Sequence, residues 1–406
     1  MIDFKKYKLG DLGEIRMCKR ILKEETNTKA GIPFYKISTF GNKADVFIDR
    51  EKFLEYKEKY SYPKKGDILI SAAGTIGRTV VFNGEESYFQ DSNIVWIEND
   101  ESKVLNEYLF YCYKNIKWYT STGSTILRLY NDNIRNSEII APDISTQKKI
   151  ADVLSCIDDK IALNNKANTE LENMAKTIYD YWFTQFDFPD KDGHPFKTSG
   201  GQMVYNETLK REIPAGWEVK RLGDVCEIVL GGTPSTDKDE YWNGNIPWLN
   251  SGEVAEFPII NAEKTVTELG IKDSATELVP AGTVTLSITR HLRPSILTMD
   301  ACINQSVVGI KENKIFSKYF LYPFISSKIN HYMMLRTGAQ QPHINKETVD
   351  ETLVCIPSAE ILEKYNNEVS SIYERIILNA KETKKLTMLR EYLLPLLMNG
   401  QITIKE

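Results

Sequence analysis

The chain contains one sequence pattern twice, and the two copies lie more than 200 residues apart. KLGDLGEI from Lys8 returns as RLGDVCEI from Arg221, and IDDKIALN from Ile157 returns as IYERIILN from Ile372. A repeat of this length is a whole domain followed by a helix, and it is too long for a solenoid of short repeats. We therefore expect two similar units, related to each other as the halves of a dimer.

The landmarks between these segments recur in the same order. They are GIPFYKIS from Gly31 and NIPWLNSG from Asn245, KKGDILIS and PAGTVTLS ending at Ser71 and Ser287, DSNIVWI and NQSVVGI ending at Ile97 and Ile310, TGS at 122–124 and TGA at 337–339, and IIAP and VCIP ending at Pro142 and Pro357. Two copies in one chain form a pseudo-dimer, and a pseudo-dimer is suited to recognising an object with two parts.

Each copy opens with a body rich in short β-segments. In the first body, DILIS, RTVVF and NIVWI are strand-like and are separated by glycine-marked turns, while 51–60 and 106–118 have helical character. With 406 residues, 42% of them apolar, the chain can bury more than one core. We predict an α+β fold, with mixed α/β bodies at 1–144 and 213–357.

A long helix follows each body, at 145–185 and 358–400. Ser145 is a candidate N-cap of the first helix, and Asn399 with Gly400 is a stop signal for the second. The seam positions alternate in steps of four and three, which is the heptad spacing of a coiled coil. They are Ile150, Leu154, Ile157, Ile161, Asn164, Asn168, Leu171, Ala175, Ile178 and Trp182 in the first helix, and Tyr365, Val369, Ile372, Ile376, Asn379, Thr383, Leu386, Arg390, Leu393 and Leu397 in the second. We expect an antiparallel pair that relates the two bodies by a pseudo-two-fold axis.

Polar residues interrupt both seams near the middle of each helix. They are Asn164 and Asn168 in the first helix, and Asn379 and Thr383 in the second. In an antiparallel pair the middle of one helix meets the middle of the other, so these side chains should face one another and fix the register at some cost in stability. The alternative is that Asn164 and Asn379 are solvated.

The remaining bulk features are less specific. Residues 186–212 are rich in Gly, Pro and charge and should form a linker. No stretch approaches the roughly 20 apolar residues of a membrane span, and the N-terminus lacks a signal-peptide core, so we expect a cytoplasmic protein with no membrane contact. The six cysteines form no metal-binding pattern, and we interpret them as buried or inert.

The charge balance constrains a nucleic-acid partner. The net charge is −5, and residues 1–144 carry 22 basic and 21 acidic side chains. A neutral or acidic chain ordinarily does not bind DNA. If this chain binds DNA, it uses local basic patches or relies on a partner for much of the phosphate contact.

The residues at this point resemble a known family, the specificity subunits of type I restriction-modification systems. The matching segments are IPAGWEVKRLGDVCEI from Ile213, FDFPDKDGHPFKTSGG from Phe186, GGTPSTDKDEYWNGNIPWLNSGEV from Gly231, GTIGRTVV from Gly74, TGAQQPHIN from Thr337 and LLPLLMNGQI from Leu393. The resemblance covers essentially the whole chain.

This resemblance implies that the two bodies are target recognition domains, each reading one half of a split, asymmetric site on double-stranded DNA. It implies that the helices set the half-site spacing and form part of a platform for two modification subunits. Those partners would bind S-adenosylmethionine and methylate adenine, and restriction subunits using ATP and magnesium would complete the nuclease. The chain itself would bind no cofactor and carry no catalytic residue.

A search for chemistry agrees with that expectation. The chain has no GxxxxGK[ST] phosphate loop and no motif of an adenine methyltransferase. Asp49, Glu55 and Lys57 imitate a nuclease pattern, but they belong to a charged run typical of a solvated helix. The four histidines are too dispersed to predict a metal site. Two alternatives stay open: a fused subunit with intrinsic methyltransferase or nuclease activity, and a coiled-coil scaffold.

Candidate DNA contacts lie in two pairs of equivalent loops. Gln can pair with adenine edges and Arg with guanine through two hydrogen bonds, so loops that carry these residue types suit base readout. The candidates are Thr75, Arg78, Ser124, Thr125 and Arg128 in the first body, and Arg290, His291, Arg293, Gln340, Gln341 and His343 in the second. The alternative for Arg78 and Arg293 is an ordinary surface ion pair.

Overall fold

The chain folds into two compact units, and each unit contains one body and parts of both long helices. The computed structural model describes residues 3–118, 128–289, 291–338 and 342–404. One unit comprises Met1–Ile161 with Leu386–Glu406, and the other comprises Ala162–Lys385. The compact units therefore differ from the sequence repeats, because the end of each long helix packs with the body of the opposite repeat.

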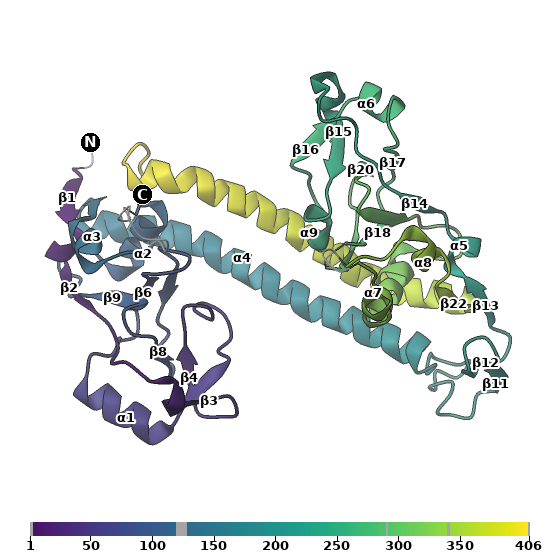
Figure 1. The fold of residues 1–406 in the computed structure, drawn as a ribbon, viewed down its shortest axis with the longest axis horizontal. Helices are drawn as coiled ribbons and strands as arrows, with labels where there is room; N and C mark the ends of the chain where they lie inside the picture. The colour runs from purple at the N-terminus through teal and green to yellow at the C-terminus, as the bar shows by residue number, and fades with distance from the viewer. Residues whose placement is uncertain (1–2, 119–127, 290, 339–341, 405–406) are drawn as a thin grey trace. The chain divides into compact units, whose positions relative to one another are not determined.

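The described residues of the first unit form three sheets and three short helices, in addition to the long-helix segments (Figure 1). An antiparallel sheet has the order β2-β9-β6-β7, a mixed sheet the order β3-β5-β4-β8, and β1 pairs with β10. The strands are β1 Lys5–Lys8, β2 Gly13–Arg16, β3 Thr26–Asn27, β4 Ile32–Tyr35, β5 Val46–Ile48, β6 Ile68–Ser71, β7 Thr79–Val81, β8 Tyr88–Phe89, β9 Ile94–Asn99 and β10 Glu138–Ala141. The helices are α1 Arg50–Lys59, α2 Asn106–Asn115 and α3 Asn131–Asn136.

The second unit repeats this plan. Its sheets have the orders β14-β21-β18-β19 and β16-β15-β20-β17, with the pairs β13-β22 and β11-β12 beside them. The strands are β11 Met203–Asn206, β12 Arg211–Pro214, β13 Glu218–Arg221, β14 Ile228–Leu230, β15 Trp242–Leu249, β16 Lys264–Val266, β17 Leu278–Val279, β18 Val284–Ser287, β19 Pro294–Ile296, β20 Ala301–Ile303, β21 Val307–Ile310 and β22 Leu353–Ile356. The helices are α5 Leu222–Val225, α6 Glu268–Lys272, α7 Lys318–Leu335 and α8 Lys346–Asp350.

The duplication extends to strand register. Ile15 pairs with Ile97 in the first unit, and their counterparts Ile228 and Ile310 pair in the second. The parallel pairings also correspond, with Phe34 opposite Tyr88 and Trp248 opposite Cys302. The mixed sheets differ at both edges: the first has an extra strand, β3, beside β5, and the second has an extra strand, β17, beside β20. The predicted α+β fold with two tandem bodies is confirmed.

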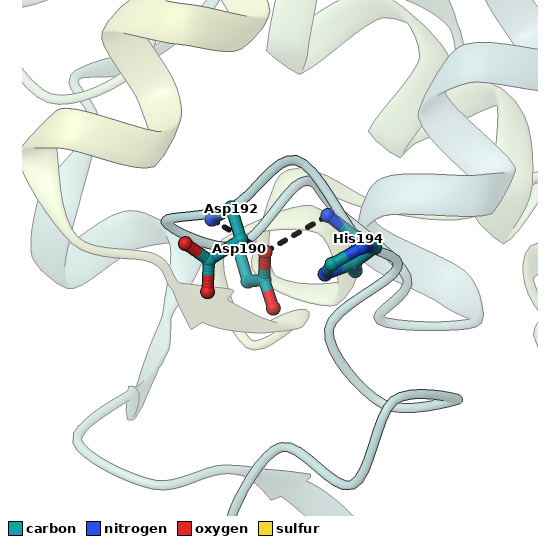
Figure 2. A group of neighbouring side chains, drawn as sticks. All are labelled: Asp190, Asp192 and His194. Carbon is teal, nitrogen blue, oxygen red and sulfur yellow. Dashed lines mark hydrogen bonds between the residues drawn. The ribbon is translucent and has the colours of Figure 1, made fainter.

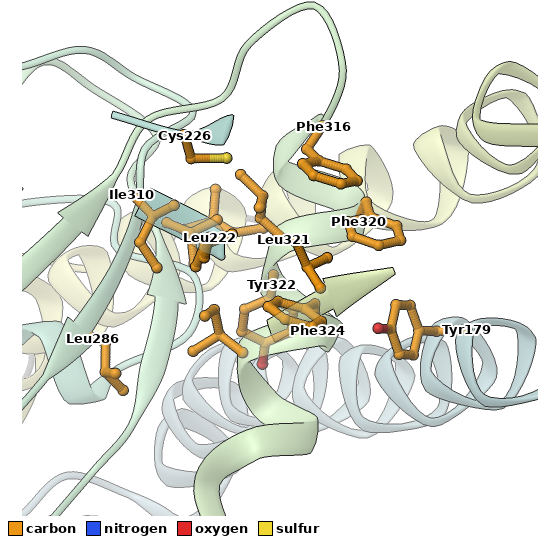
Figure 3. Close-up of a cluster of buried hydrophobic side chains, with 14 of the residues drawn as sticks. Tyr179, Leu222, Cys226, Leu286, Ile310, Phe316, Phe320, Leu321, Tyr322 and Phe324 are labelled. Carbon is orange, nitrogen blue, oxygen red and sulfur yellow. The ribbon is translucent and has the colours of Figure 1, made fainter. Parts of the chain in front are cut away.

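Each unit buries its own core. In the second unit, α7 packs over the antiparallel sheet, and Phe320, Leu321 and Phe324 lie among the side chains of Leu286 and Ile310 (Figure 3). These residues are at most 4% exposed. Burying one such side chain stabilises a fold by roughly 1.5–3 kcal/mol, so α7 is fixed firmly to its sheet.

The two long helices are α4, Ile144–Tyr179, and α9, Ala359–Met398. Their seam residues enter the cores: Ile150, Leu154 and Leu397 pack in the first unit, and Val369 and Ile376 pack in the second. The helices run antiparallel, because residues early in α4 meet residues late in α9. The predicted packing of the two helices on each other is confirmed.

The ends of the helices differ in detail from the sequence expectation. Asp143, rather than Ser145, caps α4: its carboxylate accepts hydrogen bonds from the Thr146 backbone N–H at 3.0 Å and the Thr146 hydroxyl at 2.8 Å. A π-helical turn, Asp180–Thr184, follows α4. The predicted stop of α9 is present, because Gly400 has φ +69° and a Cβ there would lie 2.5 Å from the Phe4 ring.

Candidate nucleic-acid interface

The loop between β6 and β7 presents Thr75 and Arg78 at the surface of the first unit. Its turn uses Gly74 and Gly77, which have φ +65° and +77°. Ser71 closes the loop: its hydroxyl donates to the Thr75 carbonyl and accepts from the Arg78 N–H at 2.9 Å. Both predicted residues are exposed. The backbone is thus held rigidly beneath two polar side chains.

A second segment joins this loop at Arg128. Ala73 forms a β-bridge with Arg128, and the Leu129 N–H donates to the Ala72 carbonyl at 2.8 Å. The Arg128 guanidinium donates to the Ser92 carbonyl at 3.1 Å. The structure therefore brings Thr75, Arg78 and Arg128 to one region, although Ser124 and Thr125 lie outside the described residues.

The second unit builds the same pair of segments. The Ser287 N–H donates to the Arg293 carbonyl at 3.3 Å, as the Ser71 N–H does to the Arg78 carbonyl at 2.9 Å. The Ser287 hydroxyl donates to the Thr289 carbonyl. Arg78 and Arg293 therefore occupy equivalent places in the two units.

The segment that carries His343 joins the second loop in the same manner. Thr289 forms a β-bridge with His343, and the Ile344 N–H donates to the Ile288 carbonyl at 3.0 Å. His343 therefore corresponds to Arg128. His291 is exposed on this loop, while Arg290, Gln340 and Gln341 lie outside the described residues.

Ion pairing does not explain the two equivalent arginines. Within residues 3–118, 128–289, 291–338 and 342–404, neither Arg78 nor Arg293 forms a salt bridge, although Arg78 donates to the Phe40 carbonyl at 2.9 Å. Arg293 is exposed. Both guanidinium groups keep N–H donors available to a ligand.

A surface cavity beside Arg128 holds residues that the sequence expectation missed. The cavity measures about 350 Å³ and is lined by Met17, Ser92, Arg128, Leu129, Tyr130, Asn131 and Asp132. Tyr130 is 50% exposed there. The position of Tyr130 and Asn131 directly after the predicted loop could have identified them in the sequence. An exposed aromatic ring beside amide and guanidinium groups suits contact with nucleotides.

Three of the four polar seam residues have contacts that can be named. Asn379 Nδ2 donates to Asn168 Oδ1 at 2.9 Å, and Asn168 Nδ2 donates to the Ile376 carbonyl at 3.2 Å. Asn164 Nδ2 donates instead to Glu382 Oε2 at 2.8 Å. Asn164 and Asn379 are buried, 3% and 8% exposed, so the alternative of solvated side chains is wrong. Thr383 lies one turn beyond Asn379 on α9.

The Asn168–Asn379 contact yields a testable expectation for the helix pair. Asn379→Ala leaves Asn168 Oδ1 without its donor, and we expect the free energy of unfolding to fall by about 1–2 kcal/mol. Replacing both residues by Leu removes the buried polar groups together and should restore or exceed the original stability, because the polar pair sets register at a cost. Chemical denaturation of the three proteins measures both differences. A double-Leu protein less stable than Asn379→Ala would contradict this account.

One group of side chains offers possible metal ligands. Asp190, Asp192 and His194 lie in the segment after α4, and their ligand atoms fall within 4.8 Å of one another (Figure 2). Asp190 Oδ1 accepts hydrogen bonds from the backbone N–H groups of His194 at 2.8 Å and Asp192 at 2.9 Å. These bonds, chiefly that from His194, lower the pKa of the Asp190 carboxyl. The group thus already closes a polar turn, and nothing else in it points to an ion.

The nuclease-like pattern around α1 has an ordinary structural explanation. Glu55 forms an i,i+4 ion pair with Lys59 at 3.1 Å. The Lys57 ammonium lies over the rings of Phe53 and Tyr62. These contacts are those of a helix surface.

The cysteines are mostly buried, with one on the surface of α4. All six cysteines are free thiols, and Cys18, Cys112, Cys226 and Cys302 are buried. Burial raises the pKa of the Cys18 thiol to about 12. Cys156, however, is exposed on α4, because it lies off the helix seam.

Comparisons with known proteins agree with this architecture. The family profile described as "Type I restriction modification DNA specificity domain" matches residues 1–173 and 214–388, once on each copy of the repeat. A specificity subunit of the type I restriction enzyme MjaIX from Methanocaldococcus jannaschii is 27% identical over 392 residues, which is 92% of this chain and 88% of that protein.

Two further similarities concern part of the chain and the fold. A putative type I restriction enzyme specificity subunit of Haemophilus influenzae is 62% identical over 146 residues, a match that spans 36% of this chain and 38% of that protein. The crystal structure of a type I restriction-modification S subunit from M. genitalium has a TM-score of 0.63 at 15% identity, covering 98% of this chain and 96% of that one. This second likeness concerns the fold.

The chain belongs to the family of type I restriction-modification specificity subunits. It is the non-catalytic recognition subunit of such an enzyme, and its role is recognition of the DNA target. The resemblance drawn from the sequence is thereby confirmed, and the readings as a fused enzyme or a scaffold are set aside. Among the described residues, no helix is both long and apolar enough to cross a membrane.

Proposed function

We propose that this subunit recognises a split and asymmetric site on double-stranded DNA, with one body reading each half. The proposal assigns target recognition domains to residues 1–144 and 213–357, the long helices to 145–185 and 358–400, and a linker to 186–212. The helix pair, with Asn164, Asn168, Asn379 and Thr383 setting its register, fixes the spacing between the half-sites.

One observation carries the proposal. The two units build corresponding pairs of loops with equivalent backbone hydrogen bonds. Both loops carry an arginine, Arg78 or Arg293, but the side chains at other positions differ. The first unit presents Arg128 where the second presents His343. Because hydrogen bonds to base edges determine sequence preference, equal scaffolds with unequal side chains read unequal half-sites.

The family implies the partners. Two modification subunits bind the chain, hold S-adenosylmethionine and methylate adenine within the two half-sites. Restriction subunits, which use ATP and Mg²⁺, join this complex and cleave DNA. These partners also supply much of the phosphate contact, which is consistent with a recognition chain whose net charge is −5.

Selection of bound sequences from random DNA by the purified complex tests the split site. The expected result is enrichment of two different short blocks separated by unselected positions of constant length. Enrichment of a single continuous block, or of two identical blocks, would contradict the proposal.

Arg293→Ala gives a residue-level test. If Arg293 reads a base, affinity for the selected site should fall roughly 5- to 150-fold and one position of one half-site should become degenerate. Arg221→Ala is the matched control, because Arg221 is also exposed but lies on β13, in a different sheet of the same body. Fluorescence anisotropy on the selected site and on a variant of the second half measures both effects. A uniform loss for all sequences would assign Arg293 to a phosphate instead.

A further inference from the structure

Each unit contains a cavity at the place where three elements meet. In the first unit these are the end of α2, strand β10 and the last residues of α9, and the cavity measures about 420 Å³. In the second they are α7, strand β22 and the residues that follow α4, and the cavity measures about 220 Å³. Neither cavity includes any residue of the candidate DNA loops.

The two cavities are copies of one site. Counted from the helix N-caps Leu105 and Ser317, three lining positions correspond: they lie seven, ten and eleven residues on, at the end of α2 and along α7. These positions hold Cys112, Asn115 and Ile116 in the first unit and Phe324, Ser327 and Lys328 in the second. Phe320, near the start of α7, lines the second cavity and has no counterpart in the first.

The lining residues on the strands and at the ends of the long helices also correspond. Residues 138–140 of β10 answer to 353–355 of β22, and Met398 and Asn399 answer to Phe183 and Thr184. Each of these strand and long-helix pairs has the same separation along the chain as Pro142 and Pro357. The duplication has therefore preserved a cavity, and not only the elements around it.

Both cavities carry more positive than negative charge. In the second unit Arg211 and Lys328 line the cavity without any carboxylate, and neither forms an ion pair among the described residues. The Arg211 guanidinium lies 4.5 Å from the Phe186 ring, and the Lys328 ammonium lies 5.1 Å from the Phe324 ring. Burial, followed by the charge of Arg211, lowers the pKa of Lys328. An anion bound between them would relieve both effects.

The first cavity is also more basic than acidic, although its lysines lie at other positions: Lys328 corresponds to Ile116, the residue before Lys117. Lys6 is paired with Glu138, while Lys117, exposed just after α2, forms no ion pair within the described part of the chain. Apolar walls complete both cavities, with Ile139 and Met398 in the first and Phe320 and Trp217 in the second. The complementary ligand has a carboxylate next to an apolar group. A DNA phosphate supplies only the first of these.

We propose that the two cavities are equivalent docking sites for the same short segment of the two modification subunits, a segment with an acidic group beside an apolar side chain. This inference rests on the proposed function, which requires two identical partners on one duplicated chain. A site present twice in the chain, once in each unit, matches a partner present twice in the complex. Charge complementarity then selects an acidic segment.

Photocrosslinking at equivalent positions tests the docking site directly. Asn115 and Ser327 are exposed lining residues at the same helical position, so each is replaced in turn by p-benzoylphenylalanine in the co-expressed complex. The expected result is a crosslink from both positions to one and the same peptide of the modification subunit. Crosslinks to DNA, to a second copy of this chain or to two unrelated peptides would overturn the proposal, as would the absence of any crosslink.

Charge reversal tests the contribution of the lysines. Lys117→Glu and Lys328→Glu should each weaken binding of one modification subunit roughly 30-fold or more, and native mass spectrometry should show one bound copy instead of two. Lys117→Arg and Lys328→Arg should keep two copies. Lys43→Glu and Lys314→Glu are matched controls, because both lysines are exposed and lie outside the cavities.

The outcome separates this inference from the proposed function. If the charge-reversed complexes keep two modification subunits and still methylate a split site, the docking inference fails while the proposed function stands. If the unaltered complex methylates no split site, the proposed function fails whatever the stoichiometry.

Discussion

Inserting four residues after Asn168 is expected to lengthen the unread spacer of the DNA site by about one to two base pairs while both half-site sequences stay the same. Four residues add roughly 6 Å of helix and turn the chain by slightly more than one full turn. In a heptad seam such an insertion is a stutter, which the helix pair tolerates by local unwinding. Residues before the insertion, such as Asn164, keep their partners on α9.

The control for this insertion is an insertion of equal length elsewhere. The turn at 191–193, after α4, is exposed and lies outside both long helices and both cavities. Turns of this kind accept added residues at little cost, so the spacer should not change. DNA selection with both proteins decides the matter. An unchanged spacer and unchanged affinity after the Asn168 insertion would show that the helix pair does not set the spacing.

Asp158→Ala is expected to destabilise the first unit by about 2 kcal/mol, a value between the small effect of an exposed ion pair and the 3–5 kcal/mol of a fully buried one. Asp158 on α4 accepts from Arg390 on α9 at 2.6 Å, and from Tyr111 and Lys114 on α2 at 3.1 Å each. Its side chain is 22% exposed and that of Arg390 is 25% exposed. The substitution therefore leaves two cations without their counterion at the point where three helices meet.

Hydrogen exchange measured by mass spectrometry locates this effect. Peptides from α2 and from the end of α9 should exchange about 30-fold faster, the ratio that corresponds to about 2 kcal/mol, while peptides from α7 should not change. Asp159→Ala is the matched control: Asp159 is the next residue on the same helix, exposed and without a salt bridge among the described residues, and its loss should leave exchange close to that of the parent chain. Equal effects of the two substitutions on exchange would show that the ion pairs of Asp158 do not stabilise this unit.

The same cluster predicts a dependence on pH. Burial alone would raise the pKa of the Asp158 carboxyl, but the Arg390 hydrogen bond and the charge of Lys114 outweigh burial, so the pKa lies below its ordinary value of 3.8. A carboxyl whose pKa is lower in the folded state contributes stability above its unfolded pKa and loses it as the pH falls through the folded pKa. The stability difference between the parent chain and Asp158→Ala should therefore be full at neutral pH and should shrink below about pH 4.

Much of the fold could be predicted because it is repeated. Two weak strand patterns that agree at KKGDILIS and PAGTVTLS are stronger than either alone, and the heptads of α4 and α9 match along their whole length. The contact between the polar residues at the middle of each helix could be predicted, because the middle of one helix meets the middle of the other in an antiparallel pair. It was harder to predict which of several neighbouring polar residues caps α4, and the N-cap is Asp143 rather than Ser145.

The contacts that could not be predicted depend on three-dimensional offsets between distant segments. The pairing of Asp158 with Arg390 depends on how far one helix is shifted along the other. The heptad pattern does not determine this shift, because it repeats along each helix. The equivalence of Arg128 and His343 became visible only through their β-bridges to Ala73 and Thr289. The paired cavities need elements from three parts of the chain, and no local pattern marks them.

We propose that one chain reads two different half-sites for a methylating partner. Modified-base sequencing of genomic DNA from a methylation-free host, expressing this chain with its modification subunit, tests it most directly. We expect methyladenine at a single split motif, one on each strand, with two different halves and a spacer of fixed length. Methylation at a continuous motif, or no methylated motif from a complex that assembles normally, would contradict it.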